Sequence, residues 1–525
     1  MDYGDRLFER CRILSLFAVA VAALAMSCDD ASSACADANC AGAPASGGAD
    51  PVGGMGSGGD GSGGAPFEPQ PGLRAEFFAD YLDLALERVD ATLDFVWVND
   101  GPGAPVPADR FSARWTGSLV APATGTYTIA TETDDGVRVW VDDILLIDDW
   151  HAHFVTRNEA SVDLVAGAAV GLRVDYFELD LEASARLLWS SAALPEEVIP
   201  TASLRTAPPL LLPSPKPPYT NPVIPFDCPD PGVLALPNED PPIFAAVCTG
   251  GKFRIRTSRS LVSWANTDVF ILPDGKPPWA ANGNRNWAPE LHAVGDGVMA
   301  YFTSVNGGNV LSVGAASAPS IDGPFTDLGA PLVQNPVGVI DASYFEDDDG
   351  SKWLLDKIDG NSQGDPTPIR IRELTADGRA FADGSSPQQI LVNQSSTWEG
   401  GVVEAPWLVK RDGMYYLFYS GNVYDDRYRT GVARSAALLG PYEKHSGPIL
   451  QNNETWVGPG HGSVVVAGGL DYFVYHAWRN DGSGGNDTSQ GRNVLVDRIQ
   501  WQDGWPVIHD GTPSRTPVPW PGEAE

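Results

Sequence analysis

Five polar residues recur along the second half of the chain, four of them carboxylates and the last a histidine. They are Asp230, Glu290, Asp341, Glu404 and His461. Two carboxyl groups whose proton affinities are pushed apart can act as a general acid and a general base, and the cleavage of a glycosidic bond requires such a pair. Their chemistry depends on whether the fold brings them together.

The spacing of these five residues predicts a repeating β-structure. By subtraction they lie 60, 51, 63 and 57 residues apart, and each begins an apolar run that is followed by a Gly-containing turn and a second run such as "VMAYF" or "MYYLFY". A period of roughly 40–60 residues with two such runs per unit is typical of a β-propeller. In that all-β fold the innermost strands surround a central axis, so we expect the five side chains to converge there.

The composition limits the class of partner. The chain has 525 residues and a net charge of −34, and this length is sufficient for two or three domains with sizeable cores. An acidic mean field repels nucleic acids and polyanionic substrates, so we expect no nucleic-acid partner. The same acidity also serves to keep an exported protein soluble.

The N-terminal residues predict export. Residues 13–26 form an uncharged apolar run that follows three arginines and is too short to span a membrane comfortably, so residues 1–27 are interpreted as a signal peptide. The dipeptide Ser27-Cys28 is similar to the end of a bacterial lipoprotein signal. We therefore expect an exported protein that is either lipid-anchored at the bacterial cell envelope through Cys28 or cleaved and secreted.

Two segments of biased composition separate the expected domains. Residues 28–70 are rich in Gly, Ala, Ser and Asp, cannot bury enough apolar surface to fold, and are predicted to form a flexible tether. Residues 196–220 are rich in proline and are predicted to form a semi-rigid linker. These segments leave two folded units, residues 71–195 and residues 221–521.

Export permits disulfide bonds. Two pairs of cysteines lie close in the sequence, Cys35 with Cys40 and Cys228 with Cys248. No metal-type CxxC spacing occurs, so each pair is interpreted either as a disulfide or as free thiols. A bond between Cys228 and Cys248 would hold the strand that leads out of Asp230.

The first folded unit is rich in alternating polar and apolar residues. The run "GTYTIATETDDGVRVWVDDILLIDDW" predicts hairpins in a sandwich or barrel. With "GLRAEFF", "FSARWTGSL" and "VDYFELDLEASARLLW", the unit resembles the protective-antigen-type domain, a β-sandwich found in toxins, adhesins and glycosidases. In several adhesins of this type an Asp-Asp pair ligates a Ca²⁺ ion that holds a sugar, and Asp134 and Asp135 occupy that place. An Asp-Asp-Gly sequence is equally a plain tight turn, so the unit either binds glycan or acts as a spacer.

The second unit resembles glycoside hydrolase family 43, a family of inverting enzymes with a five-bladed propeller. The resemblance rests on "NPVIPFDCPDPGV", "NWAPEL", "VIDASYFEDDDGSKWLL", "EAPWLVKRDGMYYLFYS", "GPGHGSVV" and "GRNVLVDRIQWQDGWPVI" in this order. By the family's pattern Asp230 is the general base that activates water and Glu404 is the general acid. Asp341 would raise the pKa of the acid and orient it.

The resemblance assigns further residues to the site. His461 lies in the "GPGH" element, which in the family often approaches a Ca²⁺ ion on the axis through water, and Arg492 matches an arginine that reaches a sugar hydroxyl. Asp227 is the rival to Asp230 as base, but it precedes the apolar run and is expected to cap a loop. Two small residues depart from the pattern, because Gly232 and Ala405 stand where many members carry Ser and Gly.

Two residues of "NWAPEL" are candidates for substrate binding with structural alternatives. Glu290 stands where Asp is common in the family, and a structural hydrogen bond near the pocket is expected for it rather than a catalytic role. Trp287 either stacks on a sugar face or packs within a blade.

These observations predict an inverting glycoside hydrolase that acts on arabinose- or xylose-containing plant polysaccharides or oligosaccharides. A galactan- or galactofuranose-cleaving enzyme on the same scaffold is one alternative. A non-catalytic glycan-binding adhesin is another, although a pure binder has no need of an acid, a base and a tuning carboxylate together. We expect Ca²⁺ as the only cofactor candidate, no organic cofactor, and a monomer.

Overall fold

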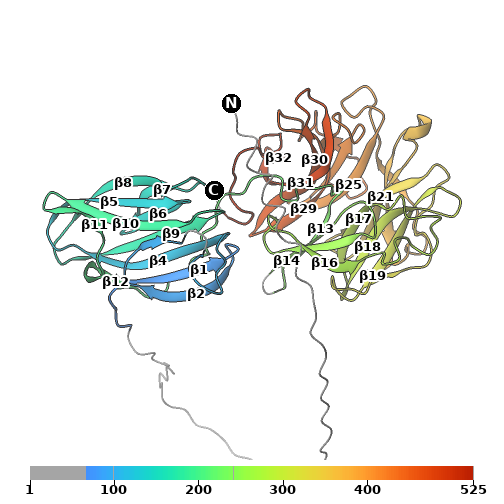
Figure 1. The fold of residues 1–525 in the computed structure, drawn as a ribbon. Helices are drawn as coiled ribbons and strands as arrows, with labels where there is room; N and C mark the ends of the chain where they lie inside the picture. Colours follow the sequence, from blue (N-terminus) through green and yellow to red (C-terminus); the bar gives the residue numbers. More distant parts are fainter. Residues whose placement is uncertain (1–66, 98–99, 240–241, 524–525) are drawn as a thin grey trace, which may run out of the picture. The chain divides into compact units, whose positions relative to one another are not determined.

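The computed structural model describes residues 67–97, 100–239 and 242–523. The predicted signal peptide, the tether up to residue 66, Cys28 and the Cys35–Cys40 pair lie outside the described residues. In the described part no helix is long and apolar enough to cross a membrane. Apart from two 3₁₀ turns, η1 (Thr201–Ser203) and η2 (Asn361–Gln363), the regular structure there consists of β-strands, as the sequence predicts (Figure 1).

The N-terminal part is a β-sandwich of two antiparallel sheets. The larger sheet has the spatial order β2 (Asp83–Asp90), β1 (Leu73–Ala79), β4 (Phe111–Val120), β9 (Ala169–Glu178), β6 (Val137–Val141) and β7 (Ile144–Asp149), with β12 (Leu204–Thr206) paired to β4. The smaller sheet has the order β11 (Leu194–Val198), β10 (Ser184–Ser191), β5 (Gly125–Asp134) and β8 (Thr156–Leu164), with β3 (Asp94–Val96) paired to β10.

Alternation along the strands explains the sandwich. In β8 half-buried and exposed residues alternate until Leu164, as expected for a strand with one face toward the core. The core between the sheets is built from large side chains such as Phe77, Trp115, Tyr176 and Trp189. The fold extends past residue 195, where the sequence placed the start of the linker, because β11 and the three-residue edge strand β12 both pair with sandwich strands. The proline run proper, residues 207–218, contains no strand.

The C-terminal part consists of five four-stranded antiparallel sheets, the blades of a five-bladed propeller. In chain order the strands are β13 (Gly232–Leu236), β14 (Ile243–Val247), β15 (Arg254–Ser258), β16 (Ala265–Phe270); β17 (Trp287–Val294), β18 (Gly297–Val305), β19 (Leu311–Ala318), β20 (Thr326–Asp327); β21 (Val339–Glu346), β22 (Lys352–Ile358), β23 (Ile369–Leu374), β24 (Gln388–Leu391); β25 (Val403–Arg411), β26 (Met414–Gly421), β27 (Arg429–Ser435), β28 (Glu443–Lys444); and β29 (Trp456–Ala467), β30 (Leu470–Asn480), β31 (Asn486–Gln502), β32 (Trp505–Ile508).

The first strands of the blades form a closed ring. Each contacts the first strand of the next blade, and β13 contacts both β17 and β29. The segment that enters the propeller also pairs with the last blade, since Ile224 bridges Val494 and Tyr219 bridges Val518. Closure therefore brings the start of every blade to one axis, which is where the sequence placed the candidate residues.

Each blade has one non-glycine residue with left-handed backbone either in the first half of its first strand or just before that strand. These residues are Asp230, Ala288, Asp341, Ala405 and His461, with φ angles from 41° to 55°. In the second to fifth blades the pairing register shifts at this point, which marks a bulge with an extra residue. The prediction that Glu290 and Glu404 share the position of the other three is therefore wrong. Glu290 lies two residues after the left-handed position and Glu404 one residue before it.

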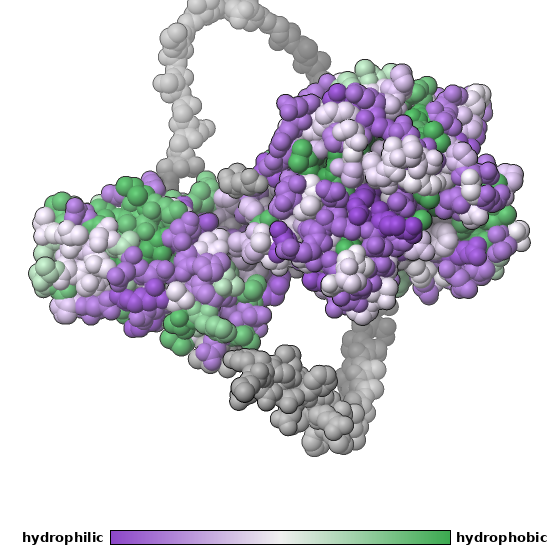
Figure 2. Space-filling view, turned by 90° about the horizontal axis from the view of Figure 1, so that it is seen from above, coloured by the Kyte–Doolittle hydropathy of each residue, from purple (hydrophilic) through white to green (hydrophobic). Residues whose placement is uncertain are grey.

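The surface differs between the two parts. On the face drawn in Figure 2 the propeller is mainly hydrophilic, whereas patches of apolar residues lie on the sandwich. Large exposed apolar side chains of the sandwich include Ile144, Phe154 and Leu181. The polar cover of the propeller agrees with the acidic composition of the chain.

Candidate active site

Asp230 lies almost buried, and nitrogen and hydroxyl groups surround its carboxylate. Its Oδ1 lies 3.0 Å from Nη1 of Arg492 and 3.3 Å from Nδ1 of both His461 and His476. Its Oδ2 accepts a hydrogen bond of 2.6 Å from the Thr249 hydroxyl. Burial by itself would raise the pKa of Asp230, but Arg492, His461 and His476 outweigh it and hold the pKa well below its usual range. The group is therefore a carboxylate at any ordinary pH and can accept a proton from water.

Two buried features fix the backbone beside Asp230. Cys228 and Cys248 form a disulfide. Cys228 lies two residues before Asp230 and Cys248 lies directly before Thr249, so the bond joins the two segments that carry these residues. The Asp230 N–H donates to Nδ1 of His476 at 3.1 Å. Burial, followed by the charge of Arg492, lowers the pKa of His476 to about 4, so this imidazole is neutral at neutral pH and can accept that hydrogen bond.

Asp341 and Glu404 lie on adjacent blades and are linked through the backbone. Oδ2 of Asp341 accepts a hydrogen bond of 2.9 Å from the N–H of Ala405, the residue that follows Glu404. Burial raises the pKa of Asp341 to about 7, and the neighbouring charges of Glu404 and Asp230 add to the rise, whereas His461 and Lys357 oppose it. The charges of both other carboxylates act on Asp341, and the Ala405 contact places Asp341 beside the segment of Glu404.

Both oxygens of the Glu404 carboxyl group have protein donors. The Tyr428 hydroxyl donates to Oε1 at 2.9 Å, and Nζ of Lys357 lies 3.3 Å from Oε2. Burial and the nearby carboxylates raise the pKa of Tyr428 well above its usual range, so its hydroxyl stays protonated. The axis therefore holds Asp230 among nitrogen groups, and Glu404 between a hydroxyl and an ammonium group next to the raised pKa of Asp341, an arrangement suited to acid–base chemistry.

The comparison with known families agrees with this geometry. Residues 219–506, more than half of the chain, match the profile of the glycosyl hydrolases family 43, and residues 67–201 match that of the PA14 domain. The chain belongs to glycosyl hydrolase family 43. Members of this family are inverting glycosidases, and here the family 43 domain is preceded by a PA14 domain.

Individual relatives are distant. A solved structure, the crystal structure of a thermostable family-43 glycoside hydrolase, is 28% identical with a TM-score of 0.51 and covers 58% of this chain and 99% of its own. The beta-D-galactofuranosidase xynD of Aspergillus niger is 28% identical over 267 residues, which are 48% of this chain and 72% of the relative.

Two further relatives match this chain at a lower identity or over a shorter stretch of sequence. The extracellular exo-alpha-(1->5)-L-arabinofuranosidase ArbA of Cellvibrio japonicus is 24% identical over 294 residues, 50% of this chain and 82% of the relative. The anti-sigma-I factor RsgI3 of Acetivibrio thermocellus is 38% identical over 135 residues, 25% of this chain. The chain spans only 21% of the length of that last protein.

The structure also places the other residues that the sequence predicted for the family 43 domain. Arg492 and His461 lie at the axis against Asp230, as given above. Glu290 is buried, and its Oε2 lies 2.8 Å from Nε2 of His292. Trp287 is half-buried at the start of β17. Asp227 is exposed and accepts the N–H of Arg492 at 2.9 Å, which is the expected loop contact rather than a place at the axis.

Sequence reasoning did not find Lys357, Tyr428, His476 or Thr249. Lys357 and His476 carried a weak signal, since each lies within a largely apolar strand sequence, "KWLLDKI" and "DYFVYHAW". Tyr428 lies in a loop and Thr249 follows a strand, and neither type nor place distinguishes them in the sequence.

The structure also explains why glycine stands at position 232, where many family members carry serine. A Cβ atom at this position would lie 2.2 Å from the carbonyl oxygen of Pro289. The bulge of β17 therefore approaches the backbone of β13 so closely that a serine does not fit without a shift.

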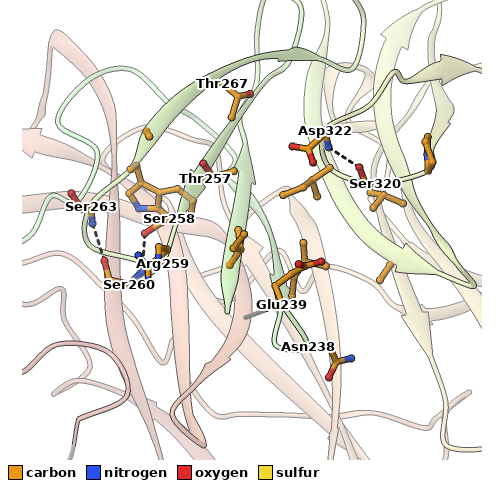
Figure 3. Close-up of a pocket in the computed structure, with 18 of the residues that line it drawn as sticks. Asn238, Glu239, Thr257, Ser258, Arg259, Ser260, Ser263, Thr267, Ser320 and Asp322 are labelled. Atoms are coloured by element: carbon orange, nitrogen blue, oxygen red, sulfur yellow. Dashed lines mark hydrogen bonds between the residues drawn. The ribbon is translucent and has the colours of Figure 1, made fainter. Parts of the chain in front are cut away.

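A polar pocket elsewhere on the propeller is drawn in Figure 3. Thr257, Ser258, Ser320 and Asp322 are among its lining residues, and none of the axis residues is. Two of its hydroxyl groups accept hydrogen bonds within local turns. Ser258 accepts the Ser260 N–H at 3.1 Å, and Ser320 accepts the Asp322 N–H at 3.2 Å. This pocket is separate from the candidate active site.

Among the described residues, one group of three acidic or metal-ligating side chains could hold a cation, and it lies in the PA14 domain. Asp134, Asp135 and Glu178 each offer a carboxylate oxygen, with these atoms within 4.8 Å of one another. Burial and neighbouring carboxylates raise the pKa of Glu178 to about 9, and its Oε1 is buried without a hydrogen-bond partner. This donor set fits a hard cation such as Ca²⁺, which prefers several oxygen ligands.

The surroundings of His461 do not fit direct coordination of such an ion. Its Nδ1 faces Asp230, and imidazole is a poor ligand for Ca²⁺. An ion at the axis would have to be held through water.

Proposed function

We propose that this chain hydrolyses glycosidic bonds with inversion, with Asp230 as the general base and Glu404 as the general acid. The observation that carries this assignment is the contrast between the two carboxyl groups. Three nitrogen groups hold Asp230 in its ionised form, whereas Glu404 lies beside Asp341, whose pKa is about 7 and whose charge depends on its neighbours. Two carboxyl groups with such different surroundings can divide the two roles.

The proposed reaction is a single displacement. Asp230 takes a proton from water as the water oxygen attacks the anomeric carbon from one face, and Glu404 gives its proton to the departing glycosidic oxygen on the other face. Asp341 keeps the proton affinity of Glu404 high by its negative charge and holds the Ala405 backbone. After the product leaves, Asp230 releases its proton to solvent and Glu404 regains one from solvent.

The substrate is proposed to be an arabinose- or xylose-containing plant polysaccharide or oligosaccharide. The arabinofuranosidase relative named above supports this choice, and the galactofuranosidase relative supports galactofuranosides as the second candidate. Arabinofuranose and galactofuranose both have five-membered rings, and they differ in the exocyclic arm, which has one carbon in arabinofuranose and two in galactofuranose. A panel of 4-nitrophenyl arabinofuranoside, xyloside and galactofuranoside separates the candidates by the ratio of their kcat/KM values.

The stereochemical experiment tests the mechanism. The anomeric configuration of the first sugar released by the purified protein is followed by ¹H NMR, and we expect inversion. Asp230→Ala and Glu404→Ala should each lower kcat by orders of magnitude while the melting temperature changes little. Glu404→Ala should slow substrates with poor leaving groups most, because a good leaving group needs less protonation. Retention would refute the mechanism, and glycan binding without hydrolysis would favour the adhesin alternative.

The remaining features of the proposal concern location and ions. We propose an exported monomer that begins at Cys28 and is anchored by lipid, with residues 28–70 as its tether, and a Ca²⁺ ion held near His461 through water. Mass spectrometry of the native N-terminus distinguishes the lipidated form from a secreted one. Elemental analysis of the purified protein checks the ion.

A further inference from the structure

A polar residue repeats on the second strands of the blades. Thr303, Ser420 and His476 each pair with the residue just before the left-handed position of their own blade. Each also accepts an N–H from the left-handed residue of the next blade. The three bonds are Asp341 N–H to Thr303 at 3.3 Å, His461 N–H to Ser420 at 2.9 Å, and Asp230 N–H to His476 at 3.1 Å. These acceptors tie each bulge to the preceding blade.

In the third blade this position is occupied by Lys357. It pairs with Ile340, the residue just before Asp341, as the other three pair in their blades. An ammonium group has three donors and no acceptor, so it cannot receive the next bulge N–H. That N–H, from Ala405, donates to Asp341 instead. Lys357 is thus the exception to this repeat, and it lies in the blade next to the one that carries Glu404.

The ammonium group of Lys357 contacts three oxygen atoms. Its side chain is fully buried, and Nζ lies 2.6 Å from Oδ1 of Asp359, 3.0 Å from Oδ1 of Asn361 and 3.3 Å from Oε2 of Glu404. A buried ammonium is costly unless it is paired and hydrogen-bonded, and here both conditions are met. Burial would lower the pKa of Lys357, but Glu404, Asp359 and Asp341 outweigh it and raise the pKa, so the group is a cation.

Several titratable groups act on Glu404 besides this cation. They are Tyr428 before β27 and Asp341 of β21, while Asp230 and His461 act on Asp341 and Asp359 acts on Lys357. The carboxylates among them favour a protonated Glu404, and Lys357 favours an ionised one. Lys357 also makes Oε2 the less favourable oxygen for a proton, which leaves the proton on Oε1 beside Tyr428.

We propose that Lys357 is a positioning residue, which holds Oε2 of Glu404 so that the transferable proton resides on Oε1 and which limits the pH range of activity on its alkaline side. This inference rests on the role of Glu404 as general acid. Because the cation favours the ionised carboxylate, the acid loses its proton at a lower pH than the carboxylates alone would set.

The test uses three variants of the full chain and the pH dependence of kcat/KM. Lys357→Met removes the cation at similar length and should move the alkaline limb upward by about one pH unit. Asp359→Asn removes a competing anion on the far side of Lys357 and should move the limb downward. Lys357→Arg retains the charge and should leave the limb within a few tenths of a unit of the wild type. If Lys357 only supported the fold, Lys357→Met and Asp359→Asn would not shift the alkaline limb in opposite directions.

A second measurement does not depend on activity. The titration of the Glu404 carboxyl is followed by infrared difference spectroscopy and assigned by its loss in Glu404→Gln. We expect Lys357→Met to raise this titration and Asp359→Asn to lower it. The inference is overturned if Lys357→Met and Lys357→Arg lower the rate equally and neither the limb nor the carboxyl titration moves. A wild type that hydrolyses no glycoside would refute the proposed function, while the infrared titration would still decide the role of Lys357.

Discussion

Asp341 is the axis carboxylate whose charge changes near neutrality. Burial raises its pKa to about 7, so it is mostly neutral at pH 5 and mostly charged at pH 9. Its negative charge raises the proton affinity of Glu404 only when it is present, which is on the alkaline side of this value.

Asp341→Asn should shift the alkaline limb of kcat/KM to lower pH. Asparagine is neutral at every pH, so Glu404 loses the neighbour that helps it keep its proton above pH 7. The shift should be on the order of one pH unit, measured with an aryl glycoside that has a poor leaving group. Asp348→Asn, an exposed carboxylate of the same blade, is the control and should leave the profile unchanged. An unchanged limb in an active Asp341→Asn variant would remove the tuning role.

At the scale of the elements, repetition made the propeller predictable and bulges made the register unpredictable. The recurrence of apolar runs located the axis, and Asp230, Asp341 and His461 proved to be the left-handed residues of their blades. Glu290 and Glu404 missed that position because a bulge adds one residue and leaves no trace in the spacing. Lys357 was missed because its partners come from a loop and from another blade, and a single-strand pattern cannot reveal such contacts.

The Cys228–Cys248 disulfide should stabilise both the fold and the site. It closes a loop with a sequence separation of 20 residues and joins the segment of Asp230 to that of Thr249. The double variant Cys228→Ser/Cys248→Ser should lose about 3 kcal/mol of unfolding free energy by the loop-entropy relation, measured by urea unfolding. We also expect a lower kcat, since the Thr249 contact loosens.

The control for the disulfide is the double variant Cys35→Ser/Cys40→Ser, which makes the same substitutions in the segment that the sequence predicts to be a tether. It should leave unfolding and kcat unchanged. Equal stability of the Cys228→Ser/Cys248→Ser variant and the wild type would show that the bond adds nothing to the fold.

At the scale of the whole molecule, the two parts place their carboxylates in different chemical settings. In the family 43 domain the carboxylates are paired with Lys357 and Arg492, which provide positive charge within the protein. In the PA14 domain Asp134, Asp135 and Glu178 form a buried acidic group, and Glu178 keeps one oxygen without a partner. The first group has Lys and Arg counter-charges built in, whereas the second sets three carboxyl groups against the side chain of one histidine, His153.

A divalent cation should therefore stabilise the PA14 domain and leave the chemistry of the propeller axis unchanged. Binding of Ca²⁺ to the folded state should add about 2.7 kcal/mol when the free ion is at 100 times its Kd, seen as a higher melting temperature of the full chain that a chelator reverses. The increase should vanish in Glu178→Gln and persist in Asp163→Asn, an exposed carboxylate of β8. Because the axis carboxylates already have protein cations beside them, kcat on a small aryl glycoside should not change with Ca²⁺ through this group. A melting temperature that responds to Ca²⁺ equally in Glu178→Gln would place the ion elsewhere, and one that never responds would mean that the acidic group folds as a plain turn.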